Sequence, residues 1–257
     1  MLKRWRHWRE DRQLARIVLS QDQWHEAIAV YPRADRLPPE LMARWQDLAL
    51  RFLLRKQFHS GSGFVITDQV RLRIAALATL PVLGLGLDWY NGWYSVVVYE
   101  TAFLSPFEEH DENGLVSHER EARSGEAWLR GPVILSWEDI SDLDDPDSNV
   151  VIHEFAHKLD MRNGDADGYP PLHRDMSPAR WQQVMQAAWQ ASQKAADHNE
   201  PTLIDPYALE GAGEFFSVLS EQFFMRPEIL RKHWPEVYEQ LALFYRYEPI
   251  SQLLYPW

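Results

Sequence analysis

The chain of 257 residues contains no cysteine. Disulfide bonds, thiolate zinc sites and cysteine nucleophiles are therefore excluded, and any metal ion must be held by nitrogen and oxygen atoms. Long hydrophobic runs are also missing, because the longest, Ile74–Leu87, is too short to cross a bilayer. The N-terminus lacks the continuous apolar segment of a secretory signal. We therefore expect a soluble cytoplasmic protein without a membrane segment.

Basic residues are in the minority, with 26 Lys and Arg against 38 Asp and Glu. The resulting net charge of −12 disfavours direct, nonspecific binding of nucleic acid. The first 20 residues are an exception, because arginines alternate there with Trp5 and Trp8. This stretch is either an arm for nucleic acid or a membrane surface, or a solvated helix whose tryptophans pack on the body. We expect the second, since the basic run is short and acidic residues follow it.

Helical patterns dominate the first third of the chain. Residues from about 21 to 58 look helical, and within them Pro38–Phe58 opens with prolines at a helix start and then shows apolar residues at helical spacing. Residues 66–80 show a second helical pattern, with Thr67 or Asp68 as a plausible N-cap. We therefore predict an N-terminal helical part that ends near residue 85.

After Gly84 the sequence pattern changes from that of helices to that of short strands. Trp93–Phe103 is rich in β-branched and aromatic residues, Gly114–Glu121 alternates more weakly, and Gly131–Ile140 contains a short apolar run between turn signals. From Asn149 onward the pattern is again mostly helical. This order predicts an α+β fold with a small mixed sheet.

We expect one domain over residues 1–257. Its N-terminal helical part covers about residues 1–85, and the strands and the helices of a metal site cover about residues 86–257. With 46% hydrophobic residues, the chain is long enough to bury a substantial core.

The segment from residue 149 to residue 160 reads NVVIHEFAHKLD and carries the chemistry. His153 and His157 are four residues apart, so on a helix their imidazoles share one face and can hold one metal ion. Glu154 lies at the edge of that face, where its carboxylate reaches a water beside the metal. Ser148 or Asn149 supplies an N-cap, and the apolar residues of the helix fix it to the core, namely Ile152, Phe155, Ala156 and Leu159.

Zinc is the metal that this donor set predicts, because two neutral imidazoles and a carboxylate leave a fourth position for water. Magnesium and calcium prefer oxygen ligands only. Zinc lowers the pKa of the water, Glu154 accepts its proton, and the carbonyl polarised by the metal is attacked. The expected reaction is peptide hydrolysis.

The third ligand is not fixed by spacing alone. The extension His-Glu-x-x-His-x-x-Gly-x-x-His is excluded, because Asp160 and Asn163 stand at its glycine and histidine positions. A carboxylate from a later helix is the other common solution, and residues 205–225 offer three on about one face. These are Glu210, Glu214 and Glu221.

The motif HEFAHKLD, the later GEFF and a tyrosine seven residues before its glutamate together resemble the gluzincin peptidases. Over most of the chain the sequence resembles the Mlc titration factor A family of bacterial cytoplasmic peptidases. In the strand–helix–helix site region it also resembles the catalytic domain of anthrax lethal factor. The likeness implies a zincin-like fold with a second, glutamate-bearing helix.

The same resemblance implies that Glu214 is the third zinc ligand and that Tyr207 stabilises the oxyanion. It also implies aminopeptidase activity and binding of the transcriptional repressor Mlc. An alternative is a repressor-binding protein without catalysis, whose zinc site is structural or latent. A metal that serves only the stability of the fold is a third reading.

Three neighbouring features have expected roles. Asp160 could orient an imidazole or a nearby loop, or could be an ordinary polar residue at the C-terminal end of its helix. Asn163–Gly168 reads as a turn-rich loop rather than a calcium site, since Arg174 stands where a calcium loop needs glutamate. Pro132–Trp137 is either an edge strand that binds an extended peptide or a buried strand. The acidic segment Glu138–Asp147 could attract a free amino terminus or merely solubilise its loop.

Overall fold

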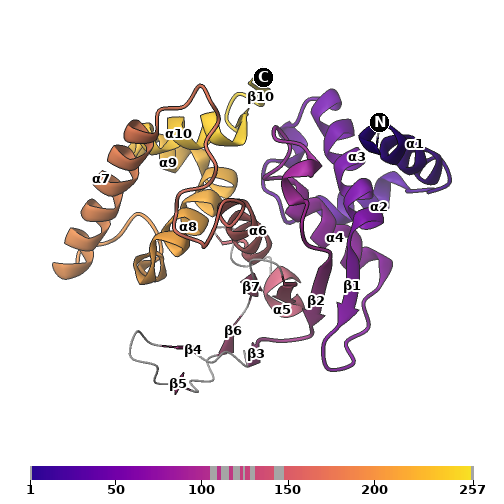
Figure 1. The fold of residues 1–257 in the computed structure, drawn as a ribbon, viewed down its shortest axis with the longest axis horizontal. Coiled ribbons are helices and arrows are strands. Elements are labelled where there is room, and N and C mark those ends of the chain that lie inside the picture. The colour runs from indigo at the N-terminus through magenta and orange to yellow at the C-terminus, as the bar shows by residue number, and fades with distance from the viewer. Residues whose placement is uncertain are drawn as a thin grey trace.

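The computed structural model describes residues 2–104, 109–110, 116–117, 122–123, 125–127, 131–141 and 148–255. Helices form most of the described chain, together with one four-stranded sheet and three two-stranded ones (Figure 1). The fold is thus mostly helical with a small sheet, in agreement with the predicted α+β class. No helix among the described residues is long and apolar enough to cross a membrane.

The N-terminal part is mostly helical, with one strand between two of its helices and a second strand at its end. Its elements are α1 (Leu2–Leu14), α2 (Gln21–Ile28), η1 (Ala34–Arg36), α3 (Pro39–Arg55), β1 (Gln57–Ser60), α4 (Asp68–Thr79), η2 (Leu87–Tyr90) and β2 (Ser95–Tyr99). The predicted segment 21–58 is therefore two helices and a strand. Thr67 is the N-cap of α4, because its side chain accepts a hydrogen bond from the Val70 N–H.

The middle of the chain consists of short strands and one short helix. They are β3 (Phe103–Leu104), β4 (Glu109–His110), β5 (Val116–Ser117), β6 (Ala122–Arg123), β7 (Gly125–Ala127), β8 (Val133–Ser136) and α5 (Trp137–Ser141). Of the predicted strand Gly114–Glu121, only Val116–Ser117 lies within the described residues, where it pairs with β4. Of the acidic segment Glu138–Asp147, residues 142–147 lie outside them.

The C-terminal part returns to helices. Its elements are α6 (Val150–Asp160), α7 (Pro178–Asp197), η3 (Pro206–Glu210), α8 (Ala212–Met225), α9 (Pro227–His233), α10 (Pro235–Tyr245), β9 (Tyr247–Glu248) and β10 (Leu253–Leu254). In Figure 1, α6 lies at the centre, between the N-terminal helices and the C-terminal ones.

The main sheet has the strand order β1-β2-β8-β7. The first three strands are parallel, and β7 is antiparallel to β8, so the sheet is mixed as predicted. Because β8 pairs with β2 on one side and β7 on the other, Pro132–Trp137 is not an edge strand. That interpretation was wrong, and its alternative, a buried strand, holds: Val133 and Leu135 are fully buried. The edge strand beside it is β7.

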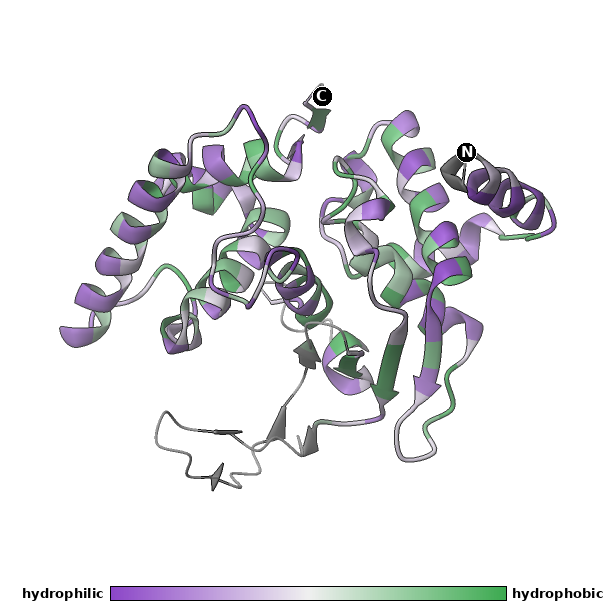
Figure 2. Ribbon diagram, in the orientation of Figure 1, coloured by the Kyte–Doolittle hydropathy of each residue, from purple (hydrophilic) through white to green (hydrophobic). Residues whose placement is uncertain are grey.

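Helix α1 differs from expectation in the face that it turns outward. Trp5 and Trp8 are 57% and 52% exposed, so the prediction that they pack on the body was wrong. The helix is mostly hydrophilic (Figure 2), and its contact with the body is polar instead. Glu10 is buried and accepts hydrogen bonds from Arg51 and Arg55 of α3.

An aromatic cluster joins the N-terminal part to α6. The ring of Phe155, on α6, lies 5.5 Å from Phe52, 5.1 Å from Tyr90 and 5.6 Å from Trp93 between ring centroids. Such aromatic pairs contribute about 0.5–1.5 kcal/mol each beyond the burial of their area. Lys56 holds the chain around this cluster, because its Nζ donates to the carbonyls of Tyr90 and Trp93 at 2.6 Å each. The side of α6 that carries Phe155 is thereby fixed by contacts within the protein alone.

Candidate metal site

Helix α6 begins as its sequence predicts. Of the two proposed caps, Asn149 is the N-cap, and its Oδ1 accepts a hydrogen bond from the Ile152 N–H at 3.1 Å. The apolar residues that were expected to fix the helix are all fully buried, namely Ile152, Phe155, Ala156 and Leu159. The cap and this stripe determine the rotation of the helix, so that His153 and His157 face α8.

The structure brings two histidines and one glutamate together. The Nε2 atoms of His153 and His157 are 3.1 Å apart, and they lie 2.9 Å and 3.3 Å from Oε2 of Glu214. One possible ligand atom from each of the three residues lies within 4.8 Å of the others. Of the described residues, these form the cluster that is suited to one metal ion.

Glu221 lies outside the metal cluster and contacts one of its histidines from behind. Its Oε1 is 2.7 Å from Nδ1 of His153, and its Oε2 accepts hydrogen bonds from the Asn149 N–H at 2.6 Å and the Ser148 hydroxyl at 3.2 Å. Glu210 lies outside the cluster, because extended backbone at Gly211 separates η3 from α8. The expectation that three glutamates share one face was therefore wrong for Glu210.

The hydrogen bond to Glu221 decides how His153 meets a ligand. A carboxylate only accepts, so Nδ1 of His153 carries a hydrogen, and a metal ion that displaces the proton from Nε2 would meet the lone pair of that nitrogen. That lone pair, the Nε2 of His157 and an oxygen of Glu214 then face one another at close range. Three electron-rich atoms in this arrangement fit a shared cation, and the set of two nitrogens and one oxygen suits zinc.

The electrostatics of the cluster agree with this. Burial by itself lowers the pKa of His153, but the hydrogen bonds to Glu214 and Glu221 outweigh it and hold the pKa well above its usual range. Burial would raise the pKa of Glu214, yet its hydrogen bonds with His153 and His157 bring that pKa far below the usual range. The site is therefore built to favour positive charge at its centre.

Asp160 orients the following loop, one of its two expected roles. Its Oδ2 accepts a hydrogen bond from the Gly168 N–H at 2.7 Å. A Cβ added at Gly168 would meet the Ala212 carbonyl oxygen at 2.5 Å, and one at Gly213 would meet the Ala166 carbonyl oxygen at 2.6 Å. Loop 163–168 thus packs closely on the first turn of α8, which carries Glu214.

Two further predicted residues lie nearby. Glu154 is buried on α6, directly after His153. Tyr207 is the second residue of η3, and its N–H donates a hydrogen bond to the side chain of Asp205. The tyrosine is 45% exposed, and its ring centroid lies 6.1 Å from that of His153. Both stand close enough to the cluster to be considered in its chemistry.

Sequence reasoning missed the role of Glu221, although its signal was present. Glu221 follows Glu214 by seven residues, which is two helical turns, so both carboxylates point to the same side of α8. One histidine ring can therefore contact both. The close contact between loop 163–168 and α8 had a weaker signal in Gly168 and Gly213, which no pattern could have paired.

Comparison with known proteins places this geometry in context. The family model described as glucose-regulated metallo-peptidase M90 matches residues 5–246. Mlc titration factor A of Yersinia pestis (strain Pestoides F) is 38% identical over 236 residues, which cover 90% of this chain and 86% of that protein. Mlc titration factor A of Yersinia pseudotuberculosis serotype O:3 (strain YPIII) shows the same identity and coverage.

Asp160 makes the stability of the protein dependent on pH. Burial raises the pKa of Asp160 to about 7, against the opposing hydrogen bond from Gly168. The folded chain therefore holds a proton that the unfolded chain releases near pH 4, so stability falls as pH rises from about 4 to 7. Between pH 5 and pH 8, we expect the Tm of the metal-free wild type to fall about 2–6 °C more than that of Asp160→Asn.

The slope with pH, rather than the absolute Tm, is the measured quantity, and calorimetry of metal-free protein supplies it. Asp167→Asn is the control, because Asp167 is in the same loop and its side chain accepts a hydrogen bond from the Tyr169 N–H. Equal slopes for the wild type and Asp160→Asn would show that Asp160 is ionised in the folded state throughout this range.

Proposed function

This chain belongs to the glucose-regulated metallo-peptidase M90 family, and from that membership we propose that it is a zinc-dependent peptidase of aminopeptidase type. The observation that carries the proposal is the convergence of His153, His157 and Glu214 on one point. We assign these three residues as the zinc ligands, Glu154 as the general base and Tyr207 as the oxyanion donor.

A bound zinc ion would supply Lewis-acid polarisation of the scissile carbonyl and would lower the pKa of a water molecule. Glu154 then accepts a proton from the attacking water and returns it to the leaving amine. The phenol of Tyr207 donates a hydrogen bond to the oxygen on which negative charge develops. Glu221 and Asn149 keep the His153 ring in place during these steps.

The substrate would lie along β7 rather than β8. Among the described residues, β7 pairs with β8 alone and lies beside α6. The free edge of a strand binds an extended peptide through main-chain hydrogen bonds. Glu138 and Asp139, exposed in α5, carry the negative charge that would favour a free amino terminus.

Binding of the transcriptional repressor Mlc is the second candidate function. It is supported by the name of the relatives, Mlc titration factor A, at 38% identity over 90% of this chain. In this alternative the zinc site is structural or latent. Both functions are compatible with a cytoplasmic location, which stays a prediction.

Replacement of Glu154 separates the two functions in activity assays. We expect Glu154→Gln to lower hydrolysis of chromogenic peptides with free amino termini by about 10²–10⁴-fold, because the proton acceptor is lost. Bound zinc, measured by atomic absorption, should stay at the wild-type level. Glu210→Gln is the matched control, because Glu210 is an exposed glutamate at the end of η3 and lies outside the metal cluster. Full activity of Glu154→Gln would contradict the assignment.

The same variant tests repressor binding. We expect purified Mlc to be retained by immobilised wild type and by Glu154→Gln alike, because removal of the base leaves the outer surface unchanged. Retention of Mlc without hydrolysis by the variant would separate the functions. If the wild type retains no Mlc, the repressor hypothesis fails for this chain whatever the peptidase result.

Removal of Glu221 should weaken zinc binding while the three ligands remain. Loss of a carboxylate that orients a ligating histidine typically lowers metal affinity about 10–100-fold. We expect a decrease of this size for Glu221→Ala in competition with a chromogenic chelator. Glu210→Ala should bind zinc as the wild type does. An unchanged affinity for Glu221→Ala would show that His153 keeps its orientation without this contact.

A further inference from the structure

The outer face of α1 combines exposed tryptophans with arginines. Trp5 and Trp8 project from successive turns, and the guanidinium carbons of Arg9 and Arg12 each lie 4.9 Å from the centroid of one indole. Trp and Arg are the residue types most enriched at the energetic centres of protein interfaces. A helix that only covers the body would turn its tryptophans inward, and α1 does not.

Ion pairs hold this helix rigidly in place. Arg6 contacts Asp88 at 2.5 Å, and Arg51 contacts Asp11 at 2.6 Å. Glu10 accepts from Arg55 at 2.8 Å and 2.9 Å, and the guanidinium groups of Arg55 and Arg51 offset the effect of burial and lower the pKa of this glutamate. Because the inner side of α1 is fixed by charge pairs, the orientation of its outer side is set before any partner arrives.

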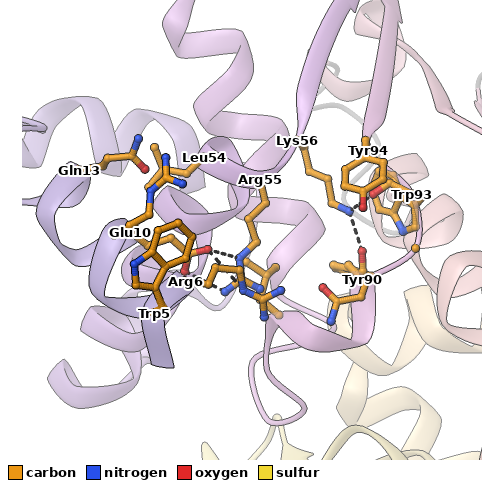
Figure 3. A pocket seen from close by; sticks show the side chains of 14 residues that line it. Trp5, Arg6, Glu10, Gln13, Leu54, Arg55, Lys56, Tyr90, Trp93 and Tyr94 are labelled. Atoms are coloured by element: carbon orange, nitrogen blue, oxygen red, sulfur yellow. Dashed lines mark hydrogen bonds and ion pairs between the residues drawn. The ribbon is translucent and has the colours of Figure 1, made fainter. Parts of the chain in front are cut away.

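A cavity of about 620 Å³ opens beside this face. Trp5 and Arg9 line one wall, and Tyr94, which is 68% exposed, lines the other. In Figure 3, Arg55 and Lys56 lie between Trp5 and Tyr94. The hydrogen bonds of Lys56 to the carbonyls of Tyr90 and Trp93 keep the second wall in position. The cavity is thus preformed and large enough for a bulky side chain.

The charge of the surface differs from that of the whole chain. Arg6, Arg51 and Arg55 are paired with carboxylates, whereas Arg9 and Arg12 have no carboxylate partner among the residues that the structure describes. Two unneutralised guanidinium groups on a chain of net charge −12 mark a local site for negative charge.

We propose that α1 and the 90–94 segment form a docking surface for an acidic segment of a partner protein, with an apolar side chain of that segment in the cavity between Trp5 and Tyr94. Within the part of α1 whose side chains are described, two guanidinium groups without a carboxylate partner are too few for a nucleic acid, which binds through many phosphate contacts. Trp8 and Arg12 are on the same helix but do not line the cavity, so the surface extends beyond the cavity itself. Apart from its tryptophans the described face of α1 is polar, which disfavours a membrane surface.

The probe is a fluorescein-labelled peptide with four glutamates on each side of a central Leu-Phe pair, measured by fluorescence anisotropy on the full chain. We expect a Kd on the order of 10–100 µM. A peptide with Ser-Ser at its centre should bind at least about tenfold more weakly, because it leaves the cavity unfilled. A counterpart with lysines in place of the glutamates should not bind measurably.

Variants of the surface complete the test. Trp5→Ala and Arg9→Ala should each weaken binding of the Leu-Phe peptide by about tenfold. Val65→Ser, which removes an exposed hydrophobic side chain elsewhere, should leave it unchanged. None of these residues belongs to the metal cluster, so peptidase activity and zinc content should stay at wild-type levels in all three. The proposal can therefore fail while the proposed function holds, and the reverse.

Three results would overturn the proposal. The first is that the acidic peptide binds no better than its lysine counterpart or does not bind at all. The second is that Trp5→Ala and Arg9→Ala, shown to be folded by circular dichroism, bind it as the wild type does. The third is that single-stranded DNA of ten nucleotides binds more tightly than the peptide and loses affinity in the same variants, which would assign the surface to nucleic acid.

Discussion

The structure depends on one constraint: α6 is buried along nearly its whole length, although five of its 11 residues are ionisable. His153, Glu154, His157, Lys158 and Asp160 are all buried. An ionisable group in the interior is costly unless it is paired and hydrogen-bonded. For three of these residues, neighbouring elements supply such partners. Helix α8 provides Glu214 and Glu221 for His153, the Gly131 carbonyl accepts from Lys158, and the Gly168 N–H donates to Asp160. The surroundings of α6 are therefore organised by its polar groups as much as by its apolar stripe.

The two carboxylates of α8 have different roles, because they contact different nitrogens of the histidines. Glu214 lies close to both Nε2 atoms, whereas Glu221 contacts Nδ1 of His153 and also accepts hydrogen bonds from Ser148 and Asn149, directly before α6. One helix thus sets both the position and the orientation of His153. Loop 163–168 holds the same helix at its start, because Gly168 and Gly213 allow backbone contacts that a side chain would prevent.

The sequence predicted correctly those features that depend on residues close together in the chain. The spacing of His153 and His157, the cap at Asn149 and the apolar stripe of α6 depend on residues within one or two turns, and the structure agrees with them. The choice of Glu214 over Glu210 came from family resemblance, because periodicity could not reveal the break at Gly211. The placement of Pro132–Trp137 failed because strand order depends on partners far along the chain. The prediction that the tryptophans of α1 pack on the body failed because buried ion pairs determine which side of this helix faces the body. Hydropathy does not register such pairs.

The aromatic cluster around Phe155 has a consequence for the order of folding. Phe52 and Phe155 are separated by roughly 100 residues, so their contact closes a long loop, and contacts of high sequence separation are slow to form. Helix α6 obtains its back wall only when this loop closes, and only then can its histidines be held at a fixed angle to α8. We therefore expect the ligand set to form late in folding, on a chain that has already collapsed.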